Sequence, residues 1–280
     1  MKTKMSTLSK LYVAFIMFLL YAPIVVMIIF SFNDSASTGV MTGVSLRWYE
    51  SLFNDGATMK ALSNTLVLAL TSSLVATVTG TAAAVGINAF RNKFIKKATM
   101  GVTNIPMMNP EIVTGISMML LFVFCAKLVG KTDVLGFGTM LVAHITFNLP
   151  YVILSVLPKL RQLDKYLPEA AMDLGCTPLQ AFFKVVLPSI STGIFSGLMM
   201  SFTLSLDDFV ISYFTQGPSF ETLPIRIFSM TKKRVTPDMY ALSTLIFVII
   251  LVLLVLLNVS QIRGEKKMSN KLNKGKGAAK

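Results

Sequence analysis

Three carboxylates lie within long apolar runs, where an ionised side chain is costly to keep. They are Glu111 and the adjacent pair Asp207 and Asp208. An acid in such surroundings is a functional candidate, because a carboxylate can replace water around a cation that passes through an apolar environment. We therefore expect these acids to line the path of a positively charged substrate. Aromatic faces could add cation–π attraction, and the candidates are Trp48, Tyr213 and Phe214.

A structural role is the alternative for the aspartate pair. Asp207 and Asp208 could cap a break in a helix, or could pair with Arg226 or with a partner subunit. Adjacent helical residues point about 100° apart, so only one of the two is expected to face the path. His144 and Asn148 lie one turn apart in another apolar run, and we expect them to form hydrogen bonds between helices rather than to bind a ligand.

The sequence offers little for catalysis, for a metal site or for a cofactor. His144 is the one histidine, and the two cysteines, Cys125 and Cys176, lie in an apolar run and in a polar insert. The segment VGKT at 129–132 resembles the end of a phosphate-binding loop, but the full pattern requires glycine where Cys125 stands and a strand before the loop. We therefore predict no catalytic residue, no metal, no cofactor and no ATP site in this chain.

The composition is that of an integral membrane protein. Hydrophobic residues make up 54% of the 280 residues, charged residues only 14%, and the mean hydropathy is +0.68. Soluble domains carry about 25% charged residues. A membrane-spanning helix needs about 20 mostly apolar residues. Six segments meet this requirement and predict an all-α membrane protein: 11–31, 62–88, 99–125, 136–157, 186–212 and 239–261.

The basic residues predict the orientation of these spans. The net charge is +13, and lysine and arginine concentrate before the first span, in the 89–98 connection and after residue 261. With six spans these regions share one side, which the positive-inside rule makes cytoplasmic, although Lys232, Lys233 and Arg234 fall on the other side. Both termini are therefore predicted to be cytoplasmic. The basic excess serves topology and contact with the lipid bilayer, and we expect no nucleic acid as a partner.

Three regions follow from this pattern. Residues 1–10 are the cytoplasmic N-terminus, 11–262 form the six-helix transmembrane domain with a polar loop at 158–187, and 263–280 form a Lys/Gly-rich cytoplasmic tail that we expect to be disordered. Pro106 and Pro110 should kink the third span. The boundaries between the regions therefore follow the change from apolar to basic composition.

The spans also predict where small residues and acids lie. In TGTAAAVG (79–86), the pairs Gly80 with Ala84 and Ala82 with Gly86 should allow neighbouring helices to approach closely. Along unbroken helices, Asp207 would lie about 28 Å from the start of its span, and Glu111 would lie about 21 Å from the inner edge of the third span.

The polar insert LPEAAMDLGCTPLQAFFKVVLP at 167–188 predicts two short helices between the fourth and fifth spans. The first should end before Gly175, a natural left-handed C-cap. The second should open with Thr177 as its N-cap, Pro178 at its first position and Gln180 completing a capping box. The local pattern alone also permits an amphipathic helix pair that lies on the bilayer surface.

The insert resembles the EAA loop of permease subunits of ATP-binding-cassette (ABC) importers. The matching positions are Glu169, Ala170, Ala171, Gly175, Leu187 and Pro188, and Val185 replaces the usual isoleucine. The resemblance implies a MetI-like, type I importer permease fold with six transmembrane helices. In that family the loop forms the coupling helices that dock on a separate ATPase. The coupling residues implied here are Glu169, Ala170, Ala171, Asp173 and Gly175.

Further segments are similar to spermidine/putrescine permeases of the PotC type across nearly the whole chain. They are SFN (31–33), RWYESLF (47–53), HITFNLPYVI (144–153), SFTLSLDDFVISYF (201–214) and GPSFETLPIRIFSM (217–230). The resemblance implies a polyamine importer in a bacterial cell membrane. Its parts would be this chain, a second homologous permease, a cytoplasmic ABC ATPase dimer and an extracytoplasmic polyamine-binding protein.

Three other functions stay open. The same machinery could carry another organic cation or a metal. The carboxylates could instead serve an ion-coupled secondary transporter, which would need no ATPase. A non-transporting membrane sensor or scaffold is the third alternative, and it gives no reason for a docking loop.

Overall fold

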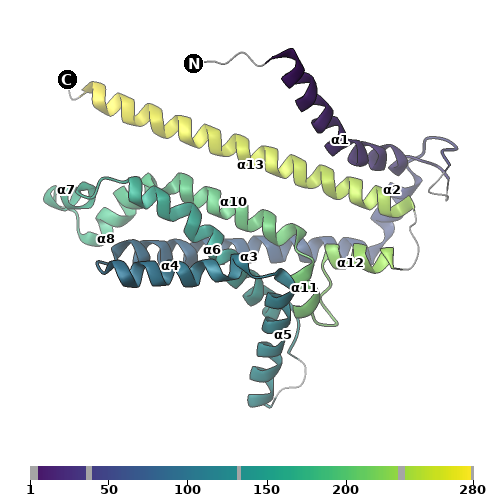
Figure 1. Cartoon of the computed structure of the whole chain (residues 1–280), viewed down its shortest axis with the longest axis horizontal. Helices are drawn as coiled ribbons and strands as arrows, with labels where there is room; N and C mark the ends of the chain where they lie inside the picture. The colour runs from purple at the N-terminus through teal and green to yellow at the C-terminus, as the bar shows by residue number, and fades with distance from the viewer. Residues whose placement is uncertain (1–5, 36–39, 131–133, 233–236, 279–280) are drawn as a thin grey trace. The chain divides into compact units, whose positions relative to one another are not determined.

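The computed structural model describes residues 6–35, 40–130, 134–232 and 237–278 (Figure 1). Within these ranges the chain is helical, with one isolated β-bridge between Asn33 and Val44. The predicted all-α class is therefore confirmed. The helices fall into two compact units, one formed by Met1–Lys60 with Arg226–Leu256 and the other by Ala61–Ile225 with Leu257–Lys280.

The first unit contains α1 (Thr7–Ser31), α2 (Arg47–Asn54), most of α12 (Leu223–Thr231) and the first part of α13 (Pro237–Ala278). Ser31 at the end of α1 shares a hydrogen bond with Tyr49 of α2, with the two hydroxyl oxygens 2.7 Å apart. The indole N–H of Trp48 donates to the carbonyl oxygen of Asn33 at 2.7 Å. The segment after α1 is therefore tied firmly to α2.

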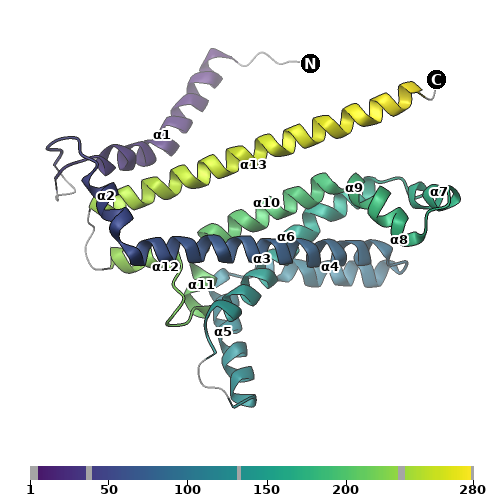
Figure 2. The same cartoon turned by 180° about the vertical axis from the view of Figure 1, so that it is seen from behind.

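The second unit is built on α6 (Phe137–Gln162), α10 (Ser191–Asp207) and most of α3 (Gly56–Ala89), with α4 (Lys93–Met108) beside them (Figures 1 and 2). Glycines bring these helices close together. A Cβ on Gly193 would lie 2.9 Å from the carbonyl oxygen of Ser155, and one on Gly80 would lie 2.7 Å from Cγ1 of Val152. Close backbone approach is the usual way for helices to associate in lipid.

The predicted packing of the small residues in α3 is confirmed for one pair and not for the other. Gly80 and Ala84 are buried against the bundle, and Ala84 has 0% exposure. Ala82 and Gly86 are exposed, and a Cβ on Gly86 would meet nothing within 4 Å. The two pairs lie on different faces of α3, and only one face meets α6.

The third predicted span is two helices rather than one kinked helix. It consists of α4, which keeps Pro106 inside it, and α5 (Glu111–Leu128), and the two run in different directions (Figures 1 and 2). Asn109 between them has an extended backbone (φ −82°, ψ 137°). Proline disfavours the helical conformation in the residue before it and donates no hydrogen bond, so Pro110 ends the helix instead of bending it.

The fifth predicted span is also interrupted. α9 (Leu187–Ser189) ends at Ile190, and the helical segments on either side of that residue are bent by 66°. At the other end, α10 stops at Asp207 and α11 (Val210–Thr215) begins after a two-residue break. The predicted span 186–212 therefore contains a bend near one end and a break near the other.

Five described helices are long and apolar enough to cross a membrane, and six are counted when the bent pair Pro178–Ser189 with Ser191–Asp207 is taken as one span. The five lie within α1, α3, α5, α6 and α13. The six predicted spans correspond to these segments, except that only α5 of the third span meets the criterion. The expected disordered tail differs from the structure, in which α13 continues to Ala278. The segment after the predicted span contains Glu265, Lys266, Lys267 and Met268, which are residue types of high helix propensity.

Candidate functional site

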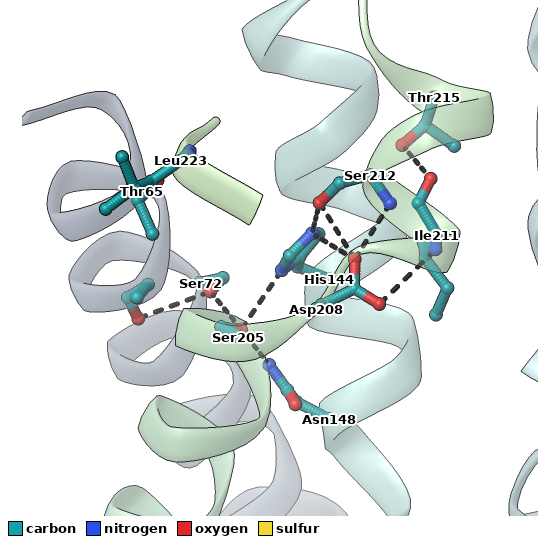
Figure 3. A network of polar contacts seen from close by, with 11 residues as sticks. Thr65, Ser72, His144, Asn148, Ser205, Asp208, Ile211, Ser212, Thr215 and Leu223 are labelled. Atoms are coloured by element: carbon teal, nitrogen blue, oxygen red, sulfur yellow. Dashed lines mark hydrogen bonds and ion pairs between the residues drawn. The ribbon is translucent and has the colours of Figure 1, made fainter. Parts of the chain in front are cut away.

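The break between α10 and α11 is capped by Asp208. Its Oδ2 accepts hydrogen bonds from the backbone N–H and the hydroxyl of Ser212, both at 2.8 Å, and its Oδ1 accepts the N–H of Ile211 at 3.3 Å (Figure 3). Asp208 is 9% exposed. The first N–H groups of α11 therefore have acceptors inside an apolar environment, where unsatisfied backbone groups are costly. The capping alternative for the aspartate pair is confirmed for Asp208.

His144 of α6 joins Asp208 from the neighbouring helix. Its Nε2 lies 3.4 Å from Oδ2 of Asp208 and 3.0 Å from the hydroxyl of Ser212, and the side chains of His144 and Asp208 are 2% and 4% exposed. The predicted role of His144 in bonding between helices is confirmed. The chain's one histidine is thus used to hold α6 against the break.

Ser205 of α10 extends this network toward α3. Its hydroxyl lies 3.1 Å from Nδ1 of His144 and 3.0 Å from the hydroxyl of Ser72, and it accepts the amide of Asn148 at 2.7 Å (Figure 3). The interhelical role predicted for Asn148 is therefore confirmed as well. The serines were not among the residues expected at this site, although Ser205 and Ser212 flank the aspartate pair in SLDDFVIS.

Asp207 has a different environment from its neighbour. It is the last residue of α10 and is exposed, whereas Asp208 is buried. Within the described residues Asp207 forms no ion pair. Asp208 follows the end of α10 with an extended backbone (φ −63°, ψ 120°), so the 100° spacing of helical neighbours does not apply to this pair. One acid is exposed and the other is buried.

The other pathway candidates of this unit lie on α5 and α11. Gly115 of α5 allows α11 to pack closely, since a Cβ there would lie 2.9 Å from Cδ2 of Phe214. Tyr213 is 41% exposed, and its ring contacts that of Phe214 edge-on at 5.5 Å. Glu111 is exposed in the first turn of α5 and not in the middle of a span as predicted, because Pro110 starts a new helix there.

Trp48 belongs to the first unit, where its side chain contacts other residues of that unit. Its N–H is bonded to Asn33, and the guanidinium carbon of Arg47 lies 5.3 Å from the centre of its ring. The ring thus takes part in a cation–π contact within the chain. Trp48 therefore anchors α2 to the segment that follows α1.

Arg226 of α12 pairs with Asp55, the residue between α2 and α3, at 3.2 Å. Asp55 also accepts hydrogen bonds from the Thr58 hydroxyl and the Ala57 N–H. The pKa of Asp55 is lowered from its usual 3.8, mainly by the hydrogen bond from Thr58 and further by Ala57 and Arg226, against an opposing effect of desolvation. Asp55 therefore caps α3 as an ionised carboxylate.

The polar insert forms the two caps that its sequence predicts. α7 (Leu167–Asp173) ends at Gly175, which has φ +90° and donates its N–H to Met172 O, while the N–H of Cys176 donates to Ala171 O. These two bonds make a Schellman motif. The Thr177–Gln180 capping box starts α8 (Pro178–Ala181), and a π-helical segment, η1 (Phe182–Val186), joins α8 to α9.

Four of the five predicted coupling residues are exposed, namely Glu169, Ala170, Asp173 and Gly175. Ala171 is 8% exposed, in a helix that packs against α8 and η1. Its small side chain thus serves the folding of the insert. Of other residues singled out in the sequence, Lys131 and Thr132 of VGKT and the basic residues Lys233 and Arg234 lie outside the described part of the chain.

Comparison with known proteins identifies the family. Residues 76–270 match the family model described as binding-protein-dependent transport system inner membrane component. The chain is 41% identical over 227 residues to the putrescine transport system permease protein PotI of Escherichia coli (strain K12), covering 81% of each protein. It is 39% identical over 237 residues to the spermidine/putrescine transport system permease protein PotC of Haemophilus influenzae, covering 85% of this chain and 90% of the relative.

The fold has a counterpart among solved structures. The structure superposes on one chain of a bacterial ABC transporter involved in the import of the acidic polysaccharide alginate. The TM-score is 0.71 at 18% sequence identity, and the match covers 91% of this chain and 94% of the other. At that identity the likeness concerns the fold, which is that of a type I, MetI-like importer permease. The chain therefore belongs to the family of inner membrane components of binding-protein-dependent transport systems, whose members are transport permeases.

Proposed function

We propose that this chain is the permease subunit of an ATP-driven ABC importer for polyamines. The observation that carries the proposal is the similarity, over more than four fifths of the chain, to two permeases whose names specify putrescine or spermidine and putrescine. The exposed carboxylate of Asp207, at the end of an apolar helix, supports a cationic substrate.

The energy for transport comes from a partner in this proposal. A cytoplasmic ABC ATPase dimer docks on the insert at 158–187, with Glu169, Ala170, Asp173 and Gly175 at the contact and Ala171 packed behind them. The two caps around Gly175 support this role, because they fold the insert into a pair of short helices. A second, homologous permease completes the pathway, and an extracytoplasmic polyamine-binding protein delivers the substrate.

The chain lies in the inner membrane with both termini in the cytoplasm. The basic residues before the first span and after residue 261 support this orientation through the positive-inside rule. Residues 1–10 form the cytoplasmic N-terminus, 11–262 form the transmembrane domain and 263–280 form the basic cytoplasmic tail. The lipid bilayer is in contact with the apolar faces of the spans.

The substrate pathway includes Asp207 as the carboxylate that meets an ammonium group. Tyr213 and Phe214 on α11 supply aromatic surface close along the chain to this acid, and Glu111 and Trp48 are further pathway residues. Asp208 contributes to substrate binding only indirectly, since its carboxylate oxygens already accept hydrogen bonds from α11 and pair with His144. One exposed acid can bind one end of a diamine, so the other end needs a further group of the assembled importer.

Uptake after deletion of the gene tests this function. Cells that lack the gene should take up radiolabelled putrescine or spermidine several-fold more slowly than wild type, and a plasmid copy should restore uptake. Excess amino acid or divalent metal should not compete. Unchanged uptake of both polyamines would contradict the proposed substrate, and competition by a metal would favour the alternative cargo.

A second measurement separates the importer from an ion-coupled transporter. Proteoliposomes that contain the assembled complex should accumulate polyamine only with ATP, and a protonophore should not slow this uptake. Transport by the isolated chain, driven by an ion gradient and abolished by the protonophore, would instead establish the secondary transporter.

A further inference from the structure

The break between α10 and α11 depends on one buried carboxylate. Asp208 accepts the N–H groups of Ile211 and Ser212 and the hydroxyl of Ser212, so one side chain satisfies the start of α11. A buried carboxylate is costly unless it is paired and hydrogen-bonded. The stability of the break therefore depends on the groups that compensate the buried negative charge of Asp208.

His144 supplies that compensation from α6. In the described part of the chain, Nε2 of His144 at 3.4 Å is the one basic nitrogen paired with Asp208. The groups around Nε2 favour a proton on this nitrogen. Ser212 donates its hydroxyl proton to Oδ2 of Asp208, so at 3.0 Å its oxygen can only accept from Nε2. Nε2 therefore carries a proton that is shared between Ser212 and Asp208.

The other imidazole nitrogen faces a hydroxyl that suits either protonation state. Nδ1 of His144 lies 3.1 Å from the oxygen of Ser205. When the imidazole is neutral, Ser205 donates to Nδ1. When it is charged, Nδ1 donates to Ser205, whose own proton can turn to Ser72 at 3.0 Å. The ring is therefore held in the same orientation in both states, as a fixed support for Asp208.

The contact between His144 and Asp208 also concerns Asp207, the residue that precedes Asp208 in the chain. Asp208 is paired with His144 of α6, whereas the adjacent Asp207 is exposed at the end of α10. We propose that His144 is a positioning residue of the cation pathway, which anchors Asp208 and so presents Asp207 alone to the substrate. The inference rests on the proposed function, and it names a residue that touches no substrate.

Transport kinetics test this role. His144→Ala should raise the KM for putrescine uptake by about tenfold, because small displacements of a binding group have large effects. A merely structural role would lower the amount of folded protein and Vmax together, with KM unchanged. Thr146→Ala is the matched control, since Thr146 is exposed on the same helix and bonds to Val142 O. A KM unaffected by His144→Ala, after normalisation to the amount of protein, would overturn the proposal.

Double variants test the route through Asp208 and Asp207. In His144→Ala the buried carboxylate loses its partner, so adding Asp208→Asn should recover part of the lost affinity and of the protein level. In an Asp207→Asn background, His144→Ala should raise KM little further, because the presented group is already gone. Two results would contradict an action of His144 through Asp208 and Asp207. One is a KM and protein level in His144→Ala/Asp208→Asn that are no better than in His144→Ala. The other is a fully additive rise in KM when His144→Ala is combined with Asp207→Asn.

An accessibility measurement is independent of the substrate. In a chain with Cys125→Ser and Cys176→Ser, Asp207→Cys should react with a cationic thiol reagent, and His144→Ala should change this rate by about threefold or more. Phe183→Cys, on the exposed surface of η1, should react equally in both backgrounds. An unchanged rate at position 207 would refute the positioning role. If the rate changes but polyamine uptake does not depend on this chain, the proposed function fails and the positioning role stands.

Discussion

Nε2 of His144 lies 3.4 Å from Oδ2 of Asp208, and both side chains are almost completely buried. This contact joins α6 to the break between α10 and α11, and it separates the two adjacent acids into different environments. Asp208 holds the protein together at this point, whereas Asp207 is exposed. The two residues should therefore respond differently to the same substitution.

Asp207→Asn should impair transport and leave the protein stable. Loss of the exposed charge should raise the KM for putrescine about tenfold or more, which corresponds to about 1.4 kcal/mol of lost binding. The amount of chain in the membrane and its melting temperature in detergent should stay as in wild type. Uptake kinetics, normalised by immunoblot, measure the first effect. A normal KM would remove Asp207 from the pathway.

Asp208→Asn should act mainly on stability. The amide keeps one oxygen acceptor but loses the charge that Ser212 and His144 bind, and a compromised buried hydrogen bond costs about 1–3 kcal/mol. We expect a lower melting temperature in detergent and less protein in the membrane. Ser189→Ala is a suitable control, because Ser189 is exposed and bonds to Val185 O. A stable Asp208→Asn protein would show that the cap is dispensable.

Gly175→Val should uncouple ATP hydrolysis from uptake. Gly175 has φ +90° and open space around it, so a valine side chain would not clash. The substitution would instead destabilise the left-handed backbone conformation by about 1–2 kcal/mol. Gly175→Asn should be milder, since asparagine tolerates this conformation. Gly86→Ala is the control, with open space but without a positive φ. The test is to measure ATP hydrolysis and polyamine transport by the reconstituted complex. Equal transport by the valine and asparagine variants would show that the backbone conformation at Gly175 does not matter for coupling.

Gly193→Ala should destabilise the contact between α6 and α10. The added Cβ would lie 2.9 Å from the carbonyl oxygen of Ser155 and 2.8 Å from Cγ of Lys159. Overpacking of this kind costs about 1–3 kcal/mol. Gly101→Ala, where nothing lies within 4 Å, should not destabilise the protein, because alanine favours the helix more than glycine does. Melting temperatures in detergent compare the two variants, and equal stability would show that the helices can separate at no cost.

The Asp55–Arg226 pair should make stability depend on acid pH. Because the pKa of Asp55 is lowered by folding, its contribution is present above the usual 3.8 and is lost as the pH falls through the lower folded value. The pair is partly exposed, so the effect should be below about 1 kcal/mol. Asp55→Asn should lower the melting temperature at pH 7 and reduce its drop between pH 5 and pH 3. Glu50→Gln, at an exposed acid of α2, should retain the full drop.

The sequence by itself determined where the apolar helices run and how the polar insert is capped. Both features are local. A span is recognised from the sum of about 20 neighbouring side chains, and the Schellman motif and the capping box involve residues at most five positions apart. Capping was one alternative for Asp207 and Asp208, and in the structure the partners of Asp208, Ile211 and Ser212, do lie in the next turn.

The third span shows where local information was incomplete. Pro106 and Pro110 were both expected to kink it, but only Pro110 interrupts the chain, and Glu111 consequently begins a new helix. Both prolines disfavour a helical conformation in the residue before them, yet the helix continues through Pro106 and ends before Pro110. The local sequence therefore does not decide at which proline the chain leaves the helix.

Only the tertiary structure decided which of two adjacent aspartates is buried. Hydropathy assigns the same value to Asp207 and Asp208, and their adjacency in the sequence does not show where the helix breaks or in which direction either side chain points. The direction is set by His144, whose ring bonds to Ser205 and Ser212, 61 and 68 residues away in the sequence. Such pairing follows from the way α6 and α10 pack, which no window of neighbouring residues contains.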